Sequence, residues 1–378
     1  MTNAFDLVVA GAGPAGLAAS IQAAQAGLGV AVLDPHGGVI DKACGEGLMP
    51  GGVEALEDLG IRPHGYPFIG IRYADAVDPT LDAYGTFPEG TGLGVRRTVL
   101  HAGMKQRAMT LGVQFLEKRA ATFEQRPDGV LVNGELFGRW LIAADGLRSQ
   151  IRRSLGVELA PRRHARLGLR RHYTVRPWSD RVEVYFAEDA EAYVTPIDAK
   201  LVGVAFLFEQ HTGEEPGAAR FDDLLGRFPL LAEHLVNKPI ASRLRGAGPF
   251  EQRVSRHVVG DVLLVGDAAG YLDPLTGEGV ALGLATAKAA VESILEDDAS
   301  AYEQRYRDLT GRYFALTSSL LAATSRPALR RSLLHLARAL PGVFDAALGT
   351  LAHLTPEDSH PSSTSPGDDL TIGLDRLL

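Results

Sequence analysis

The residues with the clearest chemical use lie near the N-terminus, in a glycine-rich segment with the spacing G-x-G-x-x-G. Gly11 permits a tight turn, Gly13 allows the backbone to approach a pyrophosphate, and Gly16 lets a helix pack closely against a strand. Pro14 and Ala15 complete the segment. The helix that follows would point its free N–H groups at negatively charged phosphates. The segment therefore predicts a dinucleotide-binding site.

The elements that position this segment follow from the flanking residues. Residues 5–10 form an apolar run that is typical of a buried parallel strand. Residues 14–26 are rich in alanine and predict a helix that stops at Gly27. Residues 30–33 predict the next strand, and Asp34 at its end would accept hydrogen bonds from an adenosine ribose. We expect two parallel strands joined by a helical crossover.

Two further motifs lie far along the chain, and each joins glycine to aspartate directly after an apolar stretch. In chain order they are Asp145-Gly146, followed by Arg152, and Gly266-Asp267, followed by Pro274-Leu275-Thr276-Gly277-Glu278-Gly279. With all three motifs in this order over residues 5–295, the chain resembles the two-domain FAD-dependent oxidoreductases. That superfamily includes aromatic-ring hydroxylases, flavin-dependent halogenases and geranylgeranyl reductases.

The resemblance implies a role for each motif. Asp267 would meet the ribityl chain of FAD, and residues 274–279 would pass beside the isoalloxazine ring, where a helix N-terminus stabilises the negative charge of reduced flavin. Arg97, three residues before Leu100 as in the family pattern, is preferred over Arg96 as the arginine that reaches the phosphates. The predicted FAD-binding residues are Gly11, Gly13, Pro14, Ala15, Gly16, Asp34, Cys44, Gly45, Arg97, Ala120, Asp145, Gly146, Arg152, Gly266, Asp267, Pro274, Gly277 and Gly279.

A second loop, residues 42–50, looks like the Cys-Gly loop of geranylgeranyl reductases and related hydroxylases and halogenases. The resemblance places Cys44 and Glu46 near the flavin and the substrate, and we take both as candidate catalytic residues. A reactive thiol at Cys44 would need a lowered pKa. The alternative is that Cys44 is a small buried residue, the commonest position for a free cysteine.

The predicted fold class is α/β, with a Rossmann-like FAD-binding domain, an inserted antiparallel-sheet domain that binds substrate, and C-terminal helices. Alternating patterns at residues 181–186 and 202–207 predict that the inserted sheet has one solvated face. The expected ranges are 1–70, 96–160 and 256–300 for the FAD-binding domain, 71–95 and 161–255 for the inserted sheet, 301–355 for the C-terminal helices, and 356–378 for a mobile tail.

Substrate contacts are expected from Tyr193, Pro196 and Pro274, because residues 191–196 resemble the strand that roofs the substrate pocket in this superfamily. That strand usually carries a tryptophan, which this chain lacks there. We favour packing of the apolar C-terminal helices on the FAD-binding domain; the alternative is that they help to receive an apolar substrate. Histidine and cysteine do not occur at metal-ligand spacing, and no G-x-S-x-G elbow exists.

Length and composition limit the other classes of function. The 378 residues are enough for two domains. The formal net charge of −8 argues against binding of nucleic acid. Cys44 is the single cysteine, so no intramolecular disulfide can form, which suits a reducing compartment, and we expect a cytoplasmic protein. The sequence has no uninterrupted apolar stretch of about 18 residues, so we expect no integral membrane segment.

The function that the sequence favours is monooxygenation of a small apolar or aromatic organic substrate through a flavin hydroperoxide, with NAD(P)H as transient electron donor. The first alternative is a double-bond reductase of the geranylgeranyl reductase type, which the Cys-Gly loop and residues 274–279 resemble closely. A halogenase is a weaker alternative, because the Trp-x-Trp-x-Ile-Pro segment of flavin halogenases is missing. A non-enzymatic FAD redox module is the last. The oligomeric state is left open.

Overall fold

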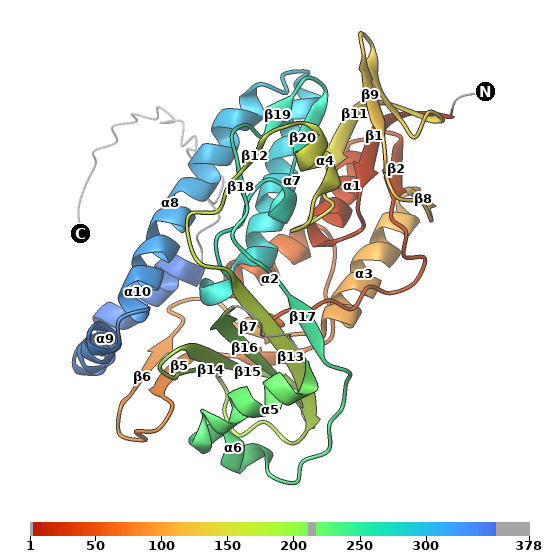
Figure 1. Cartoon of the computed structure of the whole chain (residues 1–378). Helices are drawn as coiled ribbons and strands as arrows, with labels where there is room; N and C mark the ends of the chain where they lie inside the picture. Colours follow the sequence, from red (N-terminus) through yellow and green to blue (C-terminus); the bar gives the residue numbers. More distant parts are fainter. Residues whose placement is uncertain (1–2, 211–216, 353–378) are drawn as a thin grey trace, which may run out of the picture.

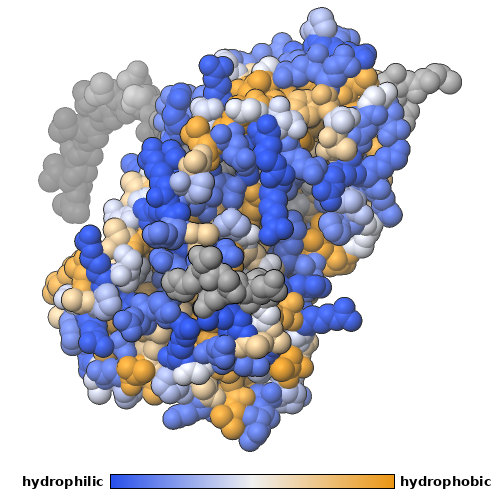
Figure 2. Space-filling view, in the orientation of Figure 1, coloured by the Kyte–Doolittle hydropathy of each residue, from blue (hydrophilic) through white to orange (hydrophobic). Residues whose placement is uncertain are grey.

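The computed structural model describes residues 3–210 and 217–352, and the predicted tail at 356–378 lies outside the described residues. Two large sheets dominate it, one in the upper and one in the lower half of Figure 1, with helices around both. This arrangement confirms the predicted α/β class. On the face in Figure 2, hydrophilic residues predominate and hydrophobic residues form small scattered groups.

The first sheet has eight strands in the order β19-β20-β11-β1-β2-β8, extended by β10 and β9 beside β11. The strand pairs from β20 to β8 are parallel. The bounds are β1 Asn3–Ala10, β2 Val30–Leu33, β8 Gln114–Leu116, β9 Phe123–Arg126, β10 Gly129–Val132, β11 Leu136–Ala143, β19 Val258–Val259 and β20 Val262–Leu264. The central strands are buried on both faces, because side chains such as Leu7, Val8 and Val9 are fully enclosed.

Helices pack around this first sheet. Helix α1 packs against both α3 and α7, which brings the start of α1 and the start of α7 to the same region. The helices are α1 Pro14–Gln25, α2 Pro50–Asp58, α3 Arg97–Thr110, α4 Gln150–Ser154 and α7 Gly279–Leu295, with short 3₁₀ turns η1 Gly266–Ala268 and η2 Pro274–Thr276. Both α1 and the 274–276 turn begin with proline, which suits the first helical position.

The second sheet has seven strands in the order β17-β13-β16-β15-β14-β5-β6. All pairs are antiparallel except β14 with β5, which come from two distant parts of the chain and run parallel. The bounds are β5 Gly70–Asp75, β6 Asp82–Thr86, β13 Arg166–Thr174, β14 Val182–Phe186, β15 Ala190–Asp198, β16 Leu201–Glu209 and β17 Arg245–Ala247. Two small sheets, β3-β7-β4 and β12-β18, join the halves; their strands are β3 Gly47–Leu48, β4 Tyr66–Phe68, β7 Gly92–Gly94, β12 Glu158–Leu159 and β18 Arg253–Val254.

The expectation of one solvated face is wrong for the middle of this sheet. All five residues of β14 are buried, as are most residues of β15. Helices α5 (Ala218–Gly226) and α6 (Pro229–Leu235) cover the face that carries Tyr185 and Phe206. The opposite face, with Val182 and Val184, packs against the last two helices. Successive residues of these strands therefore face two different apolar clusters, instead of alternating between the core and solvent.

The three C-terminal helices divide between the two sheets. Helix α8 (Ala301–Thr324) packs along α7 and touches η2, in line with packing on the FAD-binding domain. Helices α9 (Pro327–Ala339) and α10 (Pro341–Ala352) instead pack on β6, where Leu334 and Leu348 join the core of the second sheet (Figure 1). The favoured interpretation thus applies to α8 alone. Among the described residues, no helix combines the length and hydrophobicity that a bilayer crossing requires.

Candidate functional site

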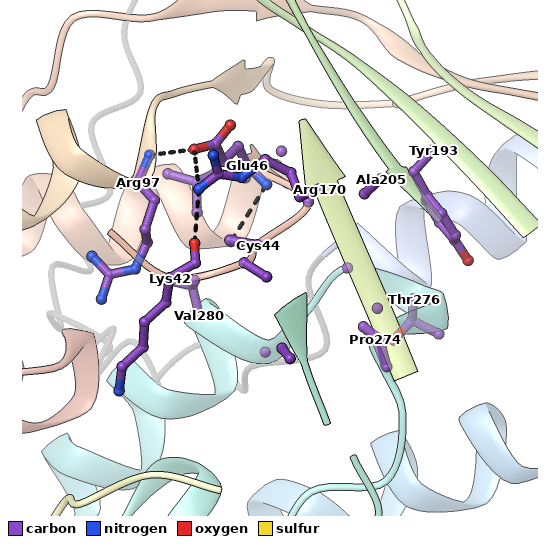
Figure 3. A pocket seen from close by; sticks show the side chains of 18 of the residues that line it. Lys42, Cys44, Glu46, Arg97, Arg170, Tyr193, Ala205, Pro274, Thr276 and Val280 are labelled. Carbon is purple, nitrogen blue, oxygen red and sulfur yellow. Dashed lines mark hydrogen bonds and ion pairs between the residues drawn. The ribbon is translucent and has the colours of Figure 1, made fainter. Parts of the chain in front are cut away.

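A cavity of about 270 Å³ lies between the two sheets, where three loops of the first sheet face strands of the second. Most predicted site residues line it: Gly13, Pro14, Ala15, Cys44, Gly45, Glu46, Arg97, Gly146, Tyr193, Gly266, Asp267, Pro274, Gly277 and Gly279. Figure 3 shows Cys44 between the cationic side chains of Lys42 and Arg97 and the segment with Pro274 and Thr276. The tertiary structure thus gathers the three motifs and the Cys44 loop around one space.

The three glycines of the first motif have different surroundings. A Cβ on Gly11, whose φ is +106°, would lie 2.4 Å from the carbonyl oxygen of Ala144, and one on Gly16 would lie 2.0 Å from the Gly11 carbonyl. Gly13, the N-cap of α1, faces open space, with no atom within 4 Å of such a Cβ. Gly11 and Gly16 therefore allow backbone segments to meet, whereas Gly13 leaves room for a ligand at the helix N-terminus.

Asp34 lies at the edge of this loop rather than in the cavity. Its Oδ2 accepts a hydrogen bond of 2.8 Å from the Ala12 N–H, and its Oδ1 accepts one from the His36 N–H. These bonds lower the pKa of Asp34 against the opposing effect of burial. The Nδ1 of His36 also lies 2.9 Å from Oδ1. The carboxylate thus fixes the loop, and Oδ2 keeps a second lone pair for a ribose hydroxyl. Ala120, also predicted to bind FAD, packs on the core after β8 and does not line the cavity.

Arg97 supplies a buried positive charge at the start of α3. It is 4% exposed, and its Nη1 has no hydrogen-bond partner among the described residues. Burial lowers the pKa of Arg97, and the nearest negative groups include Asp267, whose own pKa burial raises. A buried guanidinium requires a counter-charge. An anionic ligand in the cavity would supply it, and Lys42 lines the same space.

The second motif braces the first and the third. Asp145 Oδ2 accepts the N–H of Gln150 at 2.7 Å at the start of α4, while its Oδ1 is buried and has no hydrogen-bond partner within 3–210 and 217–352. Arg152 is 1% exposed and donates to the carbonyls of Leu147 and Asp267. Neither side chain lines the cavity, so Arg152 positions the Asp267 segment instead of facing a ligand. Direct FAD contacts for both remain predictions.

The third motif places two turns at the cavity wall. Asp273 caps η2 by accepting the Leu275 N–H at 3.0 Å, and Gly277 then takes a left-handed conformation with φ of +76°. Helix α7 starts two residues later, so its free N–H groups lie beside the cavity. Burial raises the pKa of Glu278 well above its usual value. The helix end therefore favours an anionic ring edge.

Cys44 lines the cavity beside Glu46, whose N–H donates to the sulfur at 3.4 Å. Burial raises the pKa of the Cys44 thiol, and the nearby Glu46 carboxylate raises it further. The thiol therefore stays protonated near neutral pH, contrary to what a nucleophile requires. Any chemical role for Cys44 must use the S–H group as a proton donor or hydrogen-bond donor.

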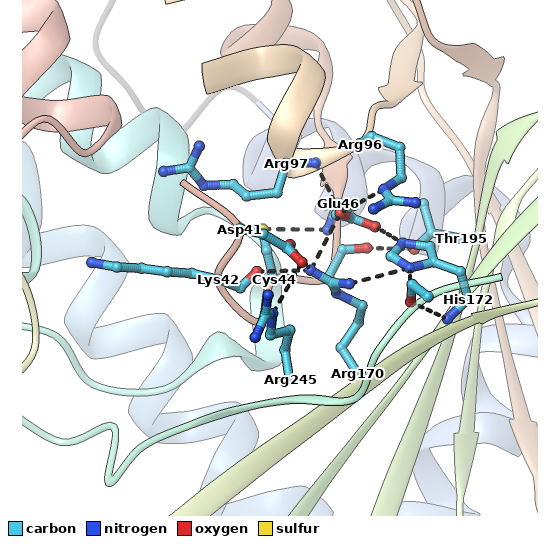
Figure 4. Close-up of polar contacts among 12 residues, drawn as sticks. Asp41, Lys42, Cys44, Glu46, Arg96, Arg97, Arg170, His172, Thr195 and Arg245 are labelled. Atoms are coloured by element: carbon cyan, nitrogen blue, oxygen red, sulfur yellow. Dashed lines mark hydrogen bonds and ion pairs between the residues drawn. The ribbon is translucent and has the colours of Figure 1, made fainter. Parts of the chain in front are cut away.

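Glu46 is the centre of a buried polar cluster (Figure 4). Its carboxylate accepts the Arg97 N–H at 2.8 Å, forms a short contact with His172 Nε2, and lies 3.7 Å from Arg96 and 3.8 Å from Arg170. The residue has a φ of +61°, a conformation that costs about 1–3 kcal/mol outside glycine and persists where surrounding contacts enforce it. Glu46 thus fixes the Cys44 loop, and its catalytic role remains a prediction.

The same cluster continues to the surface. Arg170 donates to Asp41 at 2.5 Å and to the Lys42 carbonyl at 2.9 Å, and Arg245 donates to Asp41 at 3.0 Å. Burial lowers the pKa of His172. These contacts join β13 and β17 of the second sheet to the Cys44 loop. Sequence reasoning missed Arg170, and no motif in the sequence marks it.

Tyr193 forms the opposite wall of the cavity. Its hydroxyl lies 3.0 Å from Glu191 Oε2 and 3.2 Å from the Leu275 carbonyl. Arg166 bridges Glu191 at 3.0 Å and Asp273 at 2.9 Å, and burial raises the pKa of Asp273 to about 6. Tyr193 therefore lines the cavity, and its contact with a substrate remains a prediction. Pro196, further along β15, is buried against β7 and does not line the cavity.

The rest of the cavity wall is apolar and was not foreseen from the sequence. It comes from β4, β5, β14 and β16, with Phe68, Ile71, Val182, Val184 and Leu207. Phe250 and Tyr271 close it near the third motif. These residues look like ordinary strand residues in the sequence, and only the packing of the two sheets makes them neighbours. The described residues hold no group of three or more histidine, cysteine and acidic side chains that could bind a metal ion.

The residues present fit FAD. The unpartnered Arg97 nitrogen and the open helix N-terminus at Gly13 suit a pyrophosphate. The start of α7 and the glycines of residues 277–279 suit the flavin ring. The fold and the site therefore define a two-domain flavoprotein oxidoreductase.

Comparison with known families agrees. The sequence profile of the family described as FAD binding domain matches residues 4–297, so the chain belongs to this family, and it is an FAD-dependent oxidoreductase.

Two relatives show the range of known activities. The chain is 31% identical over 346 residues to a menaquinone reductase of Mycolicibacterium smegmatis, which covers 83% of this chain and 82% of the relative. It is 32% identical over 336 residues to digeranylgeranylglycerophospholipid reductase 1 of Methanopyrus kandleri, covering 80% and 85%.

Solved structures confirm the fold. A flavoprotein/dehydrogenase from Cytophaga hutchinsonii superposes with a TM-score of 0.80 at 18% identity and 93% coverage of both chains. The flavin-dependent halogenase CmlS has a TM-score of 0.77 at 19% identity, covering 93% of this chain and 72% of CmlS.

Proposed function

We propose that this protein is an FAD-dependent reductase that saturates a carbon–carbon double bond in an isoprenoid lipid. The observation that carries the proposal is the likeness over four fifths of the chain to reductases named for menaquinone and for a digeranylgeranyl phospholipid. Both names describe molecules with long isoprenoid chains. The sequence alone favoured oxygenation, and these relatives move the preference to the reductase alternative.

The cavity supports an apolar substrate. Its far wall carries Phe68, Ile71, Val182, Val184 and Leu207, none of which can orient a polar substrate group. An isoprenoid chain needs only such a wall, because its binding is driven by removal of apolar surface from water. Packing between the two sheets also buries these side chains.

The protein's own side chains would bind the substrate and donate a proton to it. Bound FAD supplies the hydride that double-bond reduction requires. The second carbon needs a proton, and the protonated Cys44 thiol holds one at Sγ on the cavity wall. Tyr193 holds another at its hydroxyl, because burial raises its pKa well above 10. The substrate chain would then lie between residues 44 and 193, and Tyr193 would have to release its hydrogen bond to Glu191 in order to donate.

An anaerobic reoxidation experiment tests this proposal. The FAD-loaded protein is reduced without oxygen and mixed with a polyprenyl quinone or a polyprenyl phospholipid in detergent. We expect the oxidised flavin absorbance to return, with a product that has gained two hydrogen atoms per reduced bond. Ala205→Phe, which narrows the cavity, should slow this reoxidation at least about tenfold, while Ala205→Gly should not.

Two results would overturn the proposal. One is a reduced flavin that no isoprenoid probe reoxidises without oxygen. The other is an oxygen-dependent transient absorbance at roughly 370–390 nm together with an oxygenated product, which would restore monooxygenation, because the same dry cavity suits it. The NAD(P)H donor and a cytoplasmic location remain proposals, the latter resting on the single Cys44.

A further inference from the structure

Helix α8 packs along α7 and buries an unusual set of side chains (Figure 1). Its buried residues are Tyr302, Tyr306, Thr310, Tyr313, Thr317 and Leu321. Five of these six carry a hydroxyl group, whereas a helix face that packs on protein is ordinarily aliphatic. A buried tyrosine hydroxyl usually has a hydrogen-bond partner. The partners of these hydroxyls therefore indicate what α8 contributes to the protein.

Two tyrosines of this face donate to the backbone at the two ends of the third motif. The Tyr302 hydroxyl donates to the carbonyl of Leu264 at 2.8 Å, and Leu264 ends β20 directly before the Gly266 turn. The Tyr313 hydroxyl donates to the carbonyl of Asp273 at 3.1 Å, directly before η2. Burial raises the pKa of both tyrosines, so their hydroxyls stay protonated and can donate.

Other contacts hold the same two points. Near the first, Thr286 of α7 is 1% exposed and its Oγ1 accepts the N–H of Gly266 at 3.1 Å. At the second, the Asp273 carboxylate lies 2.9 Å from Arg166 of the second sheet. The Asp273 segment is therefore held on one side by the α8 hydroxyl and on the other by β13.

The bonds from α8 can act on a cofactor only through the third motif, because none of residues 301–324 lines the cavity between the two sheets. Gly266, Asp267 and residues 274–277 do line it, and α7 starts beside it at Gly279. The start of a helix favours negative charge, and its effect on a bound group depends on distance and orientation. A displaced η2 turn would therefore change how strongly the start of α7 stabilises an anionic ring.

We propose that Tyr302 and Tyr313 are positioning residues of the flavin site, through which α8 fixes the third motif against the cofactor. Tyr313 would hold the turn beside the isoalloxazine ring and so favour reduced over oxidised FAD. Tyr302 would hold the Gly266-Asp267 segment beside the ribityl chain and so contribute equally to the binding of both forms. The inference rests on FAD binding and goes beyond the proposed reductase activity, since it does not depend on the substrate.

Binding and redox measurements on Tyr302→Phe and Tyr313→Phe test this inference without turnover. Each substitution removes one hydroxyl and keeps the ring. FAD affinity is measured by fluorescence titration of the apoprotein, and the reduction potential of the loaded protein by equilibration with dyes of known potential. For Tyr302→Phe we expect an affinity about tenfold lower and an unchanged potential. For Tyr313→Phe we expect reduced FAD to be weakened about tenfold more than oxidised FAD, which lowers the two-electron potential by about 30 mV.

Tyr306→Phe is the matched control. Tyr306 lies between the other two tyrosines on the same face and is 3% exposed, but its hydroxyl forms no hydrogen bond with residues 262–279. This variant should keep the wild-type affinity and potential. Thr286→Val removes the acceptor for the Gly266 N–H and should act as Tyr302→Phe does, so it replaces that variant if urea unfolding shows that Tyr302→Phe does not fold.

The inference fails on any of three results. The first is wild-type FAD affinity in Tyr302→Phe together with a wild-type potential in Tyr313→Phe. The second is an equal effect of all three tyrosine substitutions, which would show that α8 supports only the fold. The third is a lowered potential in Tyr302→Phe and none in Tyr313→Phe. A flavin that isoprenoid probes do not reoxidise would instead count against the proposed substrate and leave this inference standing.

Discussion

Replacement of Gly13 by alanine should separate cofactor binding from folding. Gly13 is the N-cap of α1 with φ of −70°, which alanine can adopt, and its Cβ would enter open space. The change of N-cap residue costs about 1 kcal/mol at most, so the apoprotein should remain folded. The methyl group would occupy the space where a pyrophosphate meets the helix N-terminus. Loss of one or two charge-assisted hydrogen bonds, at about 1.5–3 kcal/mol in total, predicts FAD binding weaker by about 10- to 150-fold.

Gly11→Ala provides the contrast, because the same methyl group meets backbone there. Its Cβ would lie 2.4 Å from the Ala144 oxygen, at a φ of +106° that L-residues rarely adopt. Strain of about 1–3 kcal/mol and a similar cost of overpacking predict a loss of about 2–6 kcal/mol in the free energy of unfolding. The substitution at Gly11 should therefore lower the stability of the protein, whereas the substitution at Gly13 should lower its affinity for FAD.

The assay is a fluorescence titration of apoprotein with FAD, paired with urea unfolding of each apoprotein. Wild type, Gly13→Ala and Gly11→Ala are compared in the same buffer. Unchanged FAD affinity in Gly13→Ala would refute the placement of the pyrophosphate at this helix end. An apoprotein of wild-type stability with Gly11→Ala would refute the argument from the Ala144 contact.

Three more measurements test the site. Arg97→Gln should weaken FAD binding by about 10- to 100-fold. Arg96→Gln, which loses only its ion pair with the Glu46 carboxylate, should change FAD binding less than about threefold. Equal effects of the two substitutions would contradict the assignment of Arg97 as the phosphate-binding arginine. Cys44 should react slowly with iodoacetamide at pH 7 and faster only above the usual thiol pKa of about 8.5, and rapid labelling at pH 7 would show that the thiol is not buried in the way described. The folded state raises the pKa of Asp273 from 3.8 to about 6, so wild type should lose stability, by at most about 3 kcal/mol, as pH rises from about 4 to about 6. Asp273→Asn, which still accepts the Leu275 N–H, should flatten that dependence in urea unfolding, and an unchanged slope would mean that another group titrates.

The strands and motifs of the FAD-binding region could be predicted because their physical requirements are local. A parallel strand buried on both faces needs a continuous apolar run, as at residues 7–9, and a turn with φ of +106° needs Gly11. Helix α1 also starts at the expected residue, Pro14, and ends at Gln25, one residue before the predicted end. In each case the sequence within a few residues determines the conformation.

The inserted sheet could be predicted only in outline. Alternation at residues 181–186 indicated a strand, but not that helices cover one face and the C-terminal helices the other. The parallel pairing of β14 with β5 joins segments more than a hundred residues apart, as in Val182 with Ile71. Alternation fixes which residues share a face and leaves open what covers that face.

The amino-acid sequence by itself determined that this protein binds a dinucleotide, and three motifs in order made that dinucleotide FAD. Only the tertiary structure decided the state of the groups around it. In the sequence Cys44 could be a reactive thiol or a small buried residue, and burial beside Glu46 raises its pKa and keeps it protonated. In the sequence Arg97 is one of two adjacent arginines. Folding buries it and leaves its Nη1 without a hydrogen-bond partner in the part of the chain that the structure describes. Charge and protonation depend on burial and on neighbours from distant parts of the chain, and these exist only in the folded protein.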